Sequence, residues 1–304
     1  MNPTQDIFIK LPEEEKTISM ASERPLSHSR IFYQKLTENP LTIIGFALLS
    51  LILFLALFGP MLTSHTYYET QLALKNTAPC KEFWFGTDEL GRDLFCRACW
   101  GARISLFVGI TAASIDLIIG VIYGAFAGYL GGKVENAMMR LIDILASIPS
   151  LLFVILLLVI MQPGILSLVI ALTVTGWISM ARIVRGQILQ LKQLDFVKAA
   201  TALGASHQRI IFTHLLPNLT GPIITTMTLT IPSAIFAEAF LSFLGLGVQA
   251  PIASWGTMAS DGLAAMRYYP WRLFFPAACI SLTMLSFHLL GDGVSDAFDP
   301  RMQL

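Results

Sequence analysis

Long apolar stretches separated by short polar segments dominate the chain after residue 40. The stretch from Leu41 to Tyr68, for example, contains no Asp, Glu, Lys or Arg. About 20 apolar residues in a helix that rises 1.5 Å per residue cross the roughly 30 Å hydrocarbon layer of a membrane. The pattern predicts an all-α integral membrane protein with six transmembrane helices. Their expected spans, within a transmembrane domain of residues 41–304, are residues 41–60, 104–130, 144–161, 165–181, 221–244 and 273–290.

Two of these spans come from one charge-free stretch, Ile144 to Ala181, which is too long for a single crossing. Its 38 residues would make a helix of about 57 Å. Gln162-Pro163-Gly164 interrupts it near the middle with residues that favour a turn. We therefore expect a hairpin of two spans.

The distribution of Lys and Arg predicts the orientation. With the N-terminus inside, the inner segments hold 13 of the 20 Lys and Arg residues, and cytoplasmic loops carry the excess of these residues. This favours an N-in, C-in topology. The polar segment at residues 1–40 lacks the apolar core and cleavage site of a signal peptide, so we interpret it as a cytoplasmic tail.

Composition supports the membrane class and argues against several functions. The chain is 55% apolar and 13% charged, against about 25% charged residues in soluble domains. A net charge of zero gives no argument for nucleic acid as a partner. The nearest approach to a phosphate-binding loop, Gly131-Gly132-Lys133, has Ala127 in place of the first glycine and Val134 in place of Ser or Thr. We expect no catalytic residue, no metal site and no cofactor bound by this chain.

A polar segment, residues 195–217 (DFVKAATALGASHQRIIFTHLLP), interrupts the apolar pattern on the predicted cytoplasmic side. Asp195 is expected to cap a helix that Gly204 ends, and a second short helix is expected from Ser206 to Leu215, just before Pro217. We call residues 195–217 the knob. Composition alone is equally consistent with an ordinary cytoplasmic loop.

The knob resembles the EAA loop of ATP-binding-cassette (ABC) importer permeases, which sits in a cleft of the cytoplasmic ATPase. The similar residues are Ala199-Ala200, Gly204 and Leu216-Pro217, whereas Lys198 replaces the usual Glu and His214 the usual Ile. The resemblance implies that Lys192, Lys198 and Arg209 form a rim around a face that packs on the ATPase. The implied coupling residues are Asp195, Phe196, Lys198, Ala199, Ala200, Leu203, Gly204, Arg209, Leu216 and Pro217.

Further segments are similar to the oligopeptide, dipeptide and nickel permease family, in particular to its second permease subunit. They are FGTDELGRD at 85–93, GARISL at 101–106, EAFLSFLGLG at 238–247, SWG at 254–256 and GDGVSDAFDPR at 291–301. The family implies a type I importer fold in the bacterial inner membrane. The implied partners are a second permease in a heterodimer, two ABC ATPase subunits that use ATP and Mg, an external solute-binding protein and the lipid bilayer. Oligopeptides, dipeptides, nickel and other small solutes stay open as substrates.

Acids inside apolar spans are costly and need a partner or an aqueous cavity. Asp116 lies in the middle of the second span and Glu238 toward the outer end of the fifth. Both are candidates for the translocation path or its gate, and a structural hydrogen bond is the alternative, which we favour for Glu238.

The outer segments contain a second group of candidates. Asp88, Arg92 and Asp93 are expected to form a local ion network or to contact a partner, and Trp255 is a further candidate contact. Cys96-x-x-Cys99 is only a weak signal for a redox or metal pair, because no second pair accompanies it. A disulfide of Cys80 with Cys96 or Cys99 stays open.

The mechanism that the resemblance implies is mechanical: closure of the ATPases moves the knob, and the knob rocks the spans between inward-open and outward-open states. A secondary transporter would need an inverted repeat and paired intramembrane ions, and no convincing repeat is present. A membrane-embedded hydrolase would need a nucleophile or metal constellation, which no motif supplies.

Overall fold

The computed structural model describes residues 28–298, and over this range the chain consists of helices and loops with an isolated β-bridge between Thr87 and Asp93. Five helices are long and apolar enough to cross a membrane, or six if the bent pair α5 and α6 counts as one broken span. This confirms the predicted all-α membrane fold. The helices are α2 (His28–Glu38), α3 (Pro40–Phe58), α4 (Leu94–Leu130), α5 (Gly132–Ser147), α6 (Ser150–Met161), α7 (Ile165–Leu191), α8 (Asp195–Ala202), α9 (His207–Arg209), α10 (Thr220–Phe243), α11 (Trp255–Ala265) and α12 (Trp271–Phe298).

Several helices extend beyond the spans expected from hydropathy. Helix α4 begins at Leu94, about ten residues before the expected start, because the Asp93 side chain accepts a hydrogen bond from the Phe95 N–H at 2.9 Å and caps it. Hydropathy excludes this first part since it contains Arg97 and Arg103. Helices α7 and α12 likewise continue past the apolar positions at their C-terminal ends. Residues 1–27 of the expected tail and residues 299–304 lie outside the described range.

The third span differs from the expected continuous helix over 144–161. The break at Gln162 to Gly164 is present, but a second break separates α5 from α6, whose axes differ by 78°. Pro149 explains it, because proline lacks an N–H and forces the preceding residue, Ile148, out of the helical region. Helix α5 starts at Gly132, before the expected span, and is an amphipathic helix that ends at this second break.

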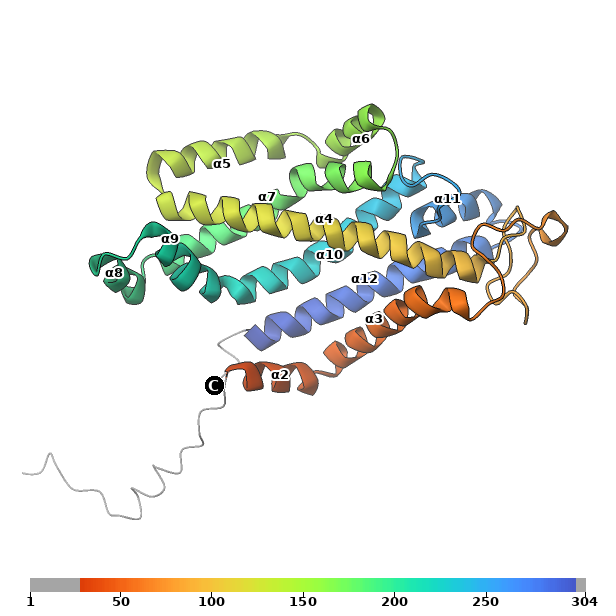
Figure 1. The fold of residues 1–304 in the computed structure, drawn as a ribbon, viewed down its shortest axis with the longest axis horizontal. Helices are drawn as coiled ribbons and strands as arrows, with labels where there is room; N and C mark the ends of the chain where they lie inside the picture. Colours follow the sequence, from red (N-terminus) through yellow and green to blue (C-terminus); the bar gives the residue numbers. More distant parts are fainter. Residues whose placement is uncertain (1–27, 299–304) are drawn as a thin grey trace, which may run out of the picture.

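Helices α4 and α7 form the closest helix pair of the bundle, and α4 also contacts α3, α10 and α12 (Figure 1). Gly120, Gly124 and Gly128 recur every four residues on α4 and face α7. A Cβ atom added at Gly124 would lie 2.4 Å from the carbonyl oxygen of Ala181 and 2.9 Å from the Cβ of Val184. Glycines at this spacing let two backbones approach closely, which is a common way for helices to pack in lipid.

The two ends of the described chain meet at one end of the bundle. The Phe32 and Phe298 rings lie 4.7 Å apart, and the Asn39 amide donates to Asp296 at 3.5 Å. Figure 1 places α2, the end of α12 and the knob helices α8 and α9 toward the same end, whereas α11 and the loop between α3 and α4 lie at the other. The knob and both described ends therefore share one face of the membrane domain.

We expect Gly124→Ala to lower the free energy of unfolding by about 1–3 kcal/mol, because the added methyl group collides with the α7 backbone. Gly186→Ala in α7 is the matched control, since no atom lies within 4 Å of its added Cβ. The control should be neutral or more stable by up to about 1 kcal/mol. Denaturant unfolding of the detergent-solubilised protein measures both, and equal stabilities would contradict the close-packing interpretation.

Candidate functional site

The knob folds into two short helices and then runs directly into a transmembrane helix. Gly204, at a φ of +79°, ends α8, and the Ser206 hydroxyl accepts from the Arg209 N–H at 3.3 Å to start α9. A π-helical turn (Ile210–Leu215) and a 3₁₀ turn (Leu216–Leu219) then lead to α10. The expected role of Asp195 as the cap is wrong: it occupies the first helical position, and Leu194 stands at the cap without a side-chain hydrogen bond.

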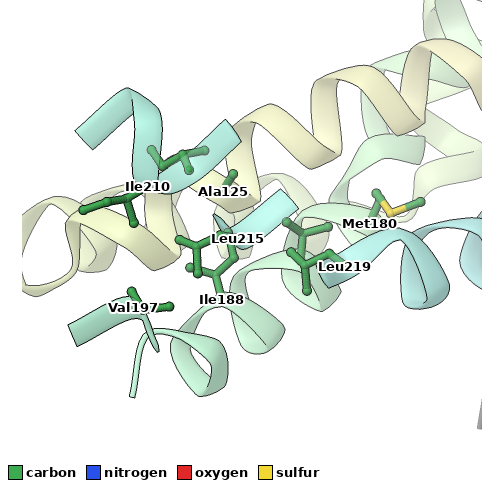
Figure 2. Close-up of a cluster of buried hydrophobic side chains, with 9 residues drawn as sticks. Ala125, Met180, Ile188, Val197, Ile210, Leu215 and Leu219 are labelled. Carbon is green, nitrogen blue, oxygen red and sulfur yellow. The ribbon is translucent and has the colours of Figure 1, made fainter. Parts of the chain in front are cut away.

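An apolar core fixes the knob to the ends of α4 and α7. Figure 2 shows Val197 of α8 and Leu215 of the π-helical turn directed toward Ile188 of α7, with Ala125 of α4 close by. All four side chains are buried. The complete cluster is Ala125, Met180, Val184, Ile188, Val197, Ile210, Ile211, Leu215 and Leu219. A close-packed interior transmits displacement, so the knob is attached to these two helices as a rigid part.

Polar contacts strengthen the same attachment. The Tyr129 hydroxyl lies 2.7 Å from Nδ1 of His207, and the Lys192 ammonium donates to the Tyr129 carbonyl oxygen at 2.8 Å. Lys192 therefore stabilises the C-terminal end of α4 instead of lying free at the rim as expected. Lys198 pairs with Asp195 at 3.5 Å, but both side chains are more than half exposed, and such pairs contribute only about 0–1 kcal/mol.

The opposite side of the knob carries exposed apolar side chains. Leu203 is 88% exposed and Phe196 42% exposed, and Ala199 is exposed beside them. Phe212, in the π-helical turn, is also exposed. Phe212 is not among the coupling residues expected from the sequence, although an exposed apolar residue in a polar segment is a signal of a partner contact. Such a group of apolar side chains on a polar element is typical of a surface that another protein covers.

A cavity of about 690 Å³ lies between α4, α6, α7 and α10. Asp116 of α4 is 4% exposed and lines it, and among the described residues its Oδ1 atom has no hydrogen-bond partner. Gly176 of α7 lies against this carboxylate, since a Cβ there would be 2.0 Å from Oδ2. The remaining wall combines apolar side chains with hydroxyl groups and one cation, Arg182. The hydroxyl-bearing residues are Ser150, Thr175, Ser179, Thr226, Thr230 and Ser233.

Glu238, the second acid expected near the path, lies elsewhere and is fully satisfied. It is 0% exposed and does not line the cavity. Its two carboxylate oxygens accept hydrogen bonds from Ser105 and Ser242, each at 2.7 Å. Ser105 also accepts from the backbone N–H of Trp255 at 3.4 Å. Glu238 therefore joins α10 to α4 and α11, which favours the structural alternative.

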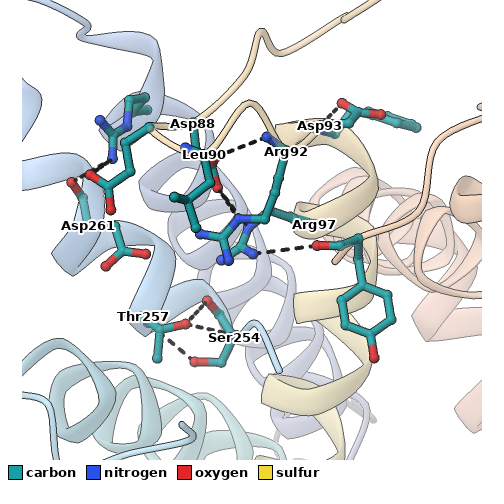
Figure 3. A network of polar contacts seen from close by, with 12 residues as sticks. Asp88, Leu90, Arg92, Asp93, Arg97, Ser254, Thr257 and Asp261 are labelled. Carbon is teal, nitrogen blue, oxygen red and sulfur yellow. Dashed lines mark hydrogen bonds and ion pairs between the residues drawn. The ribbon is translucent and has the colours of Figure 1, made fainter. Parts of the chain in front are cut away.

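The loop between α3 and α4 holds a buried ion network (Figure 3). Asp88 accepts from Arg92 Nε at 2.6 Å and lies 3.6 Å from Arg97 Nε, and across the loop Arg272 pairs with Glu89 at 3.0 Å. Burial raises the pKa of the nearby Asp261 carboxyl, and Arg97 opposes that rise.

The four residues considered for outer partner contacts are buried inside the chain. Asp88, Arg92 and Asp93 hold the loop, and the Trp255 indole donates to the Ala98 carbonyl oxygen at 2.9 Å. These positions favour the local-network interpretation.

The cysteines are free in the structure. Cys96 and Cys99 are buried and Cys80 is exposed, so none of the disulfides left open by the sequence is formed. Among residues 28–298, no group of three or more His, Cys, Asp or Glu side chains is arranged to hold a metal ion.

Comparisons with known proteins place the chain in a family. Residues 120–304 match the family described as "Binding-protein-dependent transport system inner membrane component". Residues 27–79 match the "N-terminal TM domain of oligopeptide transport permease C". The first match alone covers more than half of the chain.

Individual relatives are similar over almost their whole length. The oligopeptide transport system permease protein OppC of Bacillus subtilis (strain 168) is 52% identical over 282 residues, which cover 93% of this chain and 92% of the relative. The dipeptide transport system permease protein DppC of the same organism is 51% identical over 304 residues, covering 99% and 95%. A solved structure of the MetNI methionine ABC transporter, inward facing, superimposes with a TM-score of 0.54 at 17% identity over 65% of this chain and 94% of that one. This last likeness shows the fold alone.

The fold, the family matches and the close relatives agree. The broken third span and the polar knob belong to a helix bundle that shares its fold, over 65% of the chain, with the solved MetNI methionine ABC transporter structure. The apolar helices and the relatives indicate a multi-pass protein of the bacterial inner membrane. The chain belongs to the binding-protein-dependent transport system inner membrane components, as a permease subunit of an ABC importer.

Proposed function

We propose that this chain is one of the two permeases of an ATP-driven importer for oligopeptides or dipeptides. The two Bacillus subtilis relatives, named for oligopeptide and dipeptide transport, support peptides over nickel as the substrate class. The partners are a second permease in a heterodimer, two cytoplasmic ATPase subunits and an external solute-binding protein. ATP and Mg are used by the ATPase subunits, since the nearest approach to a phosphate loop in this chain, at Gly131 to Lys133, lacks its first glycine and its hydroxyl residue.

The knob faces the cytoplasm in this proposal, with both chain ends inside. The excess of Lys and Arg in the inner segments, 13 of 20, supports that orientation. The position of α2 and the end of α12 at the knob's end of the bundle agrees with it. An ATPase bound to the knob then lies on the side where ATP is available.

The observation that carries the coupling mechanism is the two-sided construction of the knob. Its outer side exposes Leu203 and Phe196 for an ATPase cleft, while its inner side is buried against α4 and α7 through Val197. The same two helices bring Asp116 and Gly176 to the cavity wall. Closure of the ATPases therefore moves the walls of the cavity, which is the displacement that alternating access requires.

The proposed function predicts ATP-dependent peptide uptake by the intact importer. Proteoliposomes that contain both permeases, both ATPases and the receptor should accumulate a labelled peptide with ATP, at a clamped membrane potential. Removal of ATP at the same potential should abolish uptake, because the energy comes from hydrolysis. Uptake that persists without ATP and follows the potential would contradict the proposal and support a secondary transporter.

Leu203→Asp should reduce ATPase association at least about tenfold and stop uptake, because it places a charge in the proposed apolar contact. The fold should be unaffected, since Leu203 is 88% exposed. Copurification of the ATPases with the tagged permease measures the effect. Val134→Asp, an equally drastic change at an exposed residue of α5 outside the knob, is the matched control. Equal ATPase recovery with the two variants would argue against the knob as the docking element.

Tyr129→Phe should lower the number of peptides transported per ATP about two- to fivefold, because it removes the hydroxyl that joins α4 to His207, and one hydrogen bond contributes about 1 kcal/mol. ATPase association should be retained. Tyr123→Phe is the matched control, since that hydroxyl lies on the same helix but donates to the Met138 carbonyl oxygen of α5. Parallel measurement of uptake and ATP hydrolysis gives the ratio, and an unchanged ratio for Tyr129→Phe would show that this bond transmits nothing.

A further inference from the structure

The Asp116 carboxylate is a buried acid inside a membrane-spanning helix that the described fold leaves without a complete set of hydrogen-bond partners. It is 4% exposed, it lines the cavity, and its Oδ1 atom has no hydrogen-bond partner among the described residues. Its other oxygen lies against Gly176, which has no side chain to donate a hydrogen bond. An ionised carboxylate in such a place is costly until a cation or a hydrogen-bond donor reaches it.

The hydroxyl groups that α10 brings to the cavity are acceptors, not donors. On α10, Thr226, Thr230 and Ser233 each donate their hydroxyl proton to a backbone carbonyl oxygen one turn earlier, at 2.7, 2.8 and 3.0 Å. Their oxygen lone pairs stay free to accept. Hydroxyl acceptors and an unpaired carboxylate that line one cavity match a group with several donors and a positive charge. An ammonium group has three donors and no acceptor.

The other charge in the cavity lies toward the knob end of α7. Arg182 lines the same cavity, pairs with Asp143 at 2.9 Å and keeps its side chain 46% exposed. It follows Gly176 by six residues, which is about 9 Å along the helix axis. An extended peptide advances about 3.3–3.6 Å per residue, so this offset along α7 corresponds to the length of a peptide of two or three residues.

We propose that Asp116 binds the α-ammonium group of a peptide in this cavity and that Arg182 receives the terminal carboxylate of a short one. The inference rests on the proposed peptide-import function and names two charged residues that bind the substrate inside the membrane. A volume of about 690 Å³ lies within the 300–1,000 Å³ usual for small-molecule sites. Selection of the peptide termini in the cavity then follows selection by the external receptor.

The test compares uptake of a tripeptide with a free amine and of its N-acetylated form by the intact importer in proteoliposomes. The preference of the receptor is common to all variants, so it cancels when the ratio of the two uptakes is compared between variants. Asp116→Asn should lower the ratio of free-amine to N-acetylated peptide uptake by roughly tenfold or more, which is the effect expected from losing one charge-assisted hydrogen bond. Gly176→Ala should also narrow it, because its Cβ would displace the carboxylate.

Asp292→Asn is the matched control, since it makes the same change at an exposed position of α12 outside the cavity. Its ratio should equal that of the wild type. Arg182→Gln should leave the ratio of free-amine to N-acetylated uptake unchanged. It should lower the ratio of uptake of a peptide with a free C-terminus to uptake of its C-terminally amidated form.

Three outcomes separate the claims. If wild-type importer takes up neither peptide, the proposed function itself fails. If it takes up the free peptide and the ratio is unchanged in Asp116→Asn and Gly176→Ala, only the assignment of Asp116 is overturned. Should Asp116→Asn fail to assemble with its partner chains, the ratio measured with Gly176→Ala decides the question alone.

Discussion

The close packing of α4 against α7 is the constraint on which the other features depend. In lipid, apolar side chains gain little by leaving hydrocarbon for a helix interface, so close contact between backbones must hold the pair together. Gly120, Gly124 and Gly128 provide that contact on one side. The same pair carries the knob core at one end and the cavity wall near its middle. A displacement of the knob therefore reaches the cavity through two rigid rods, without a flexible loop in between.

Much of the fold follows from the apolar pattern, because each membrane-crossing helix must be long and contain almost no charged residues. Helix ends are less visible in that pattern. Leu94 to Arg103 is helical but contains Arg97, which is buried, and Arg103, so a hydropathy argument starts the span too late. The Ile148-Pro149 pair is a sequence signal for a helix break, because the residue before a proline disfavours the helical conformation. The long apolar run around it instead favoured a straight helix. Local backbone chemistry decided the geometry there, not hydrophobicity.

The site was less predictable, since its parts come from distant segments. The knob could be located from its polarity and from Gly204, yet nothing in the sequence pairs Tyr129 with His207, which are 78 positions apart. The glycines of α4 were overlooked, although their spacing of four is a packing signal in an apolar helix. The resemblance to the EAA loop implied a rim position for Lys192, whereas here it binds the last carbonyl groups of α4.

The two intramembrane acids show how one physical cost leads to opposite roles. Both are buried in apolar helices, where a carboxylate needs partners. Glu238 obtains them inside the chain from Ser105 and Ser242 and so fixes three helices together. Asp116 lines a cavity in which the α10 hydroxyl groups already donate their protons to carbonyl oxygens of their own helix. These hydroxyl groups therefore supply no donor for the carboxylate. Stability alone does not explain an acid kept in that position, because an apolar residue of similar size would remove the cost. A charged group that enters and leaves the cavity does explain it.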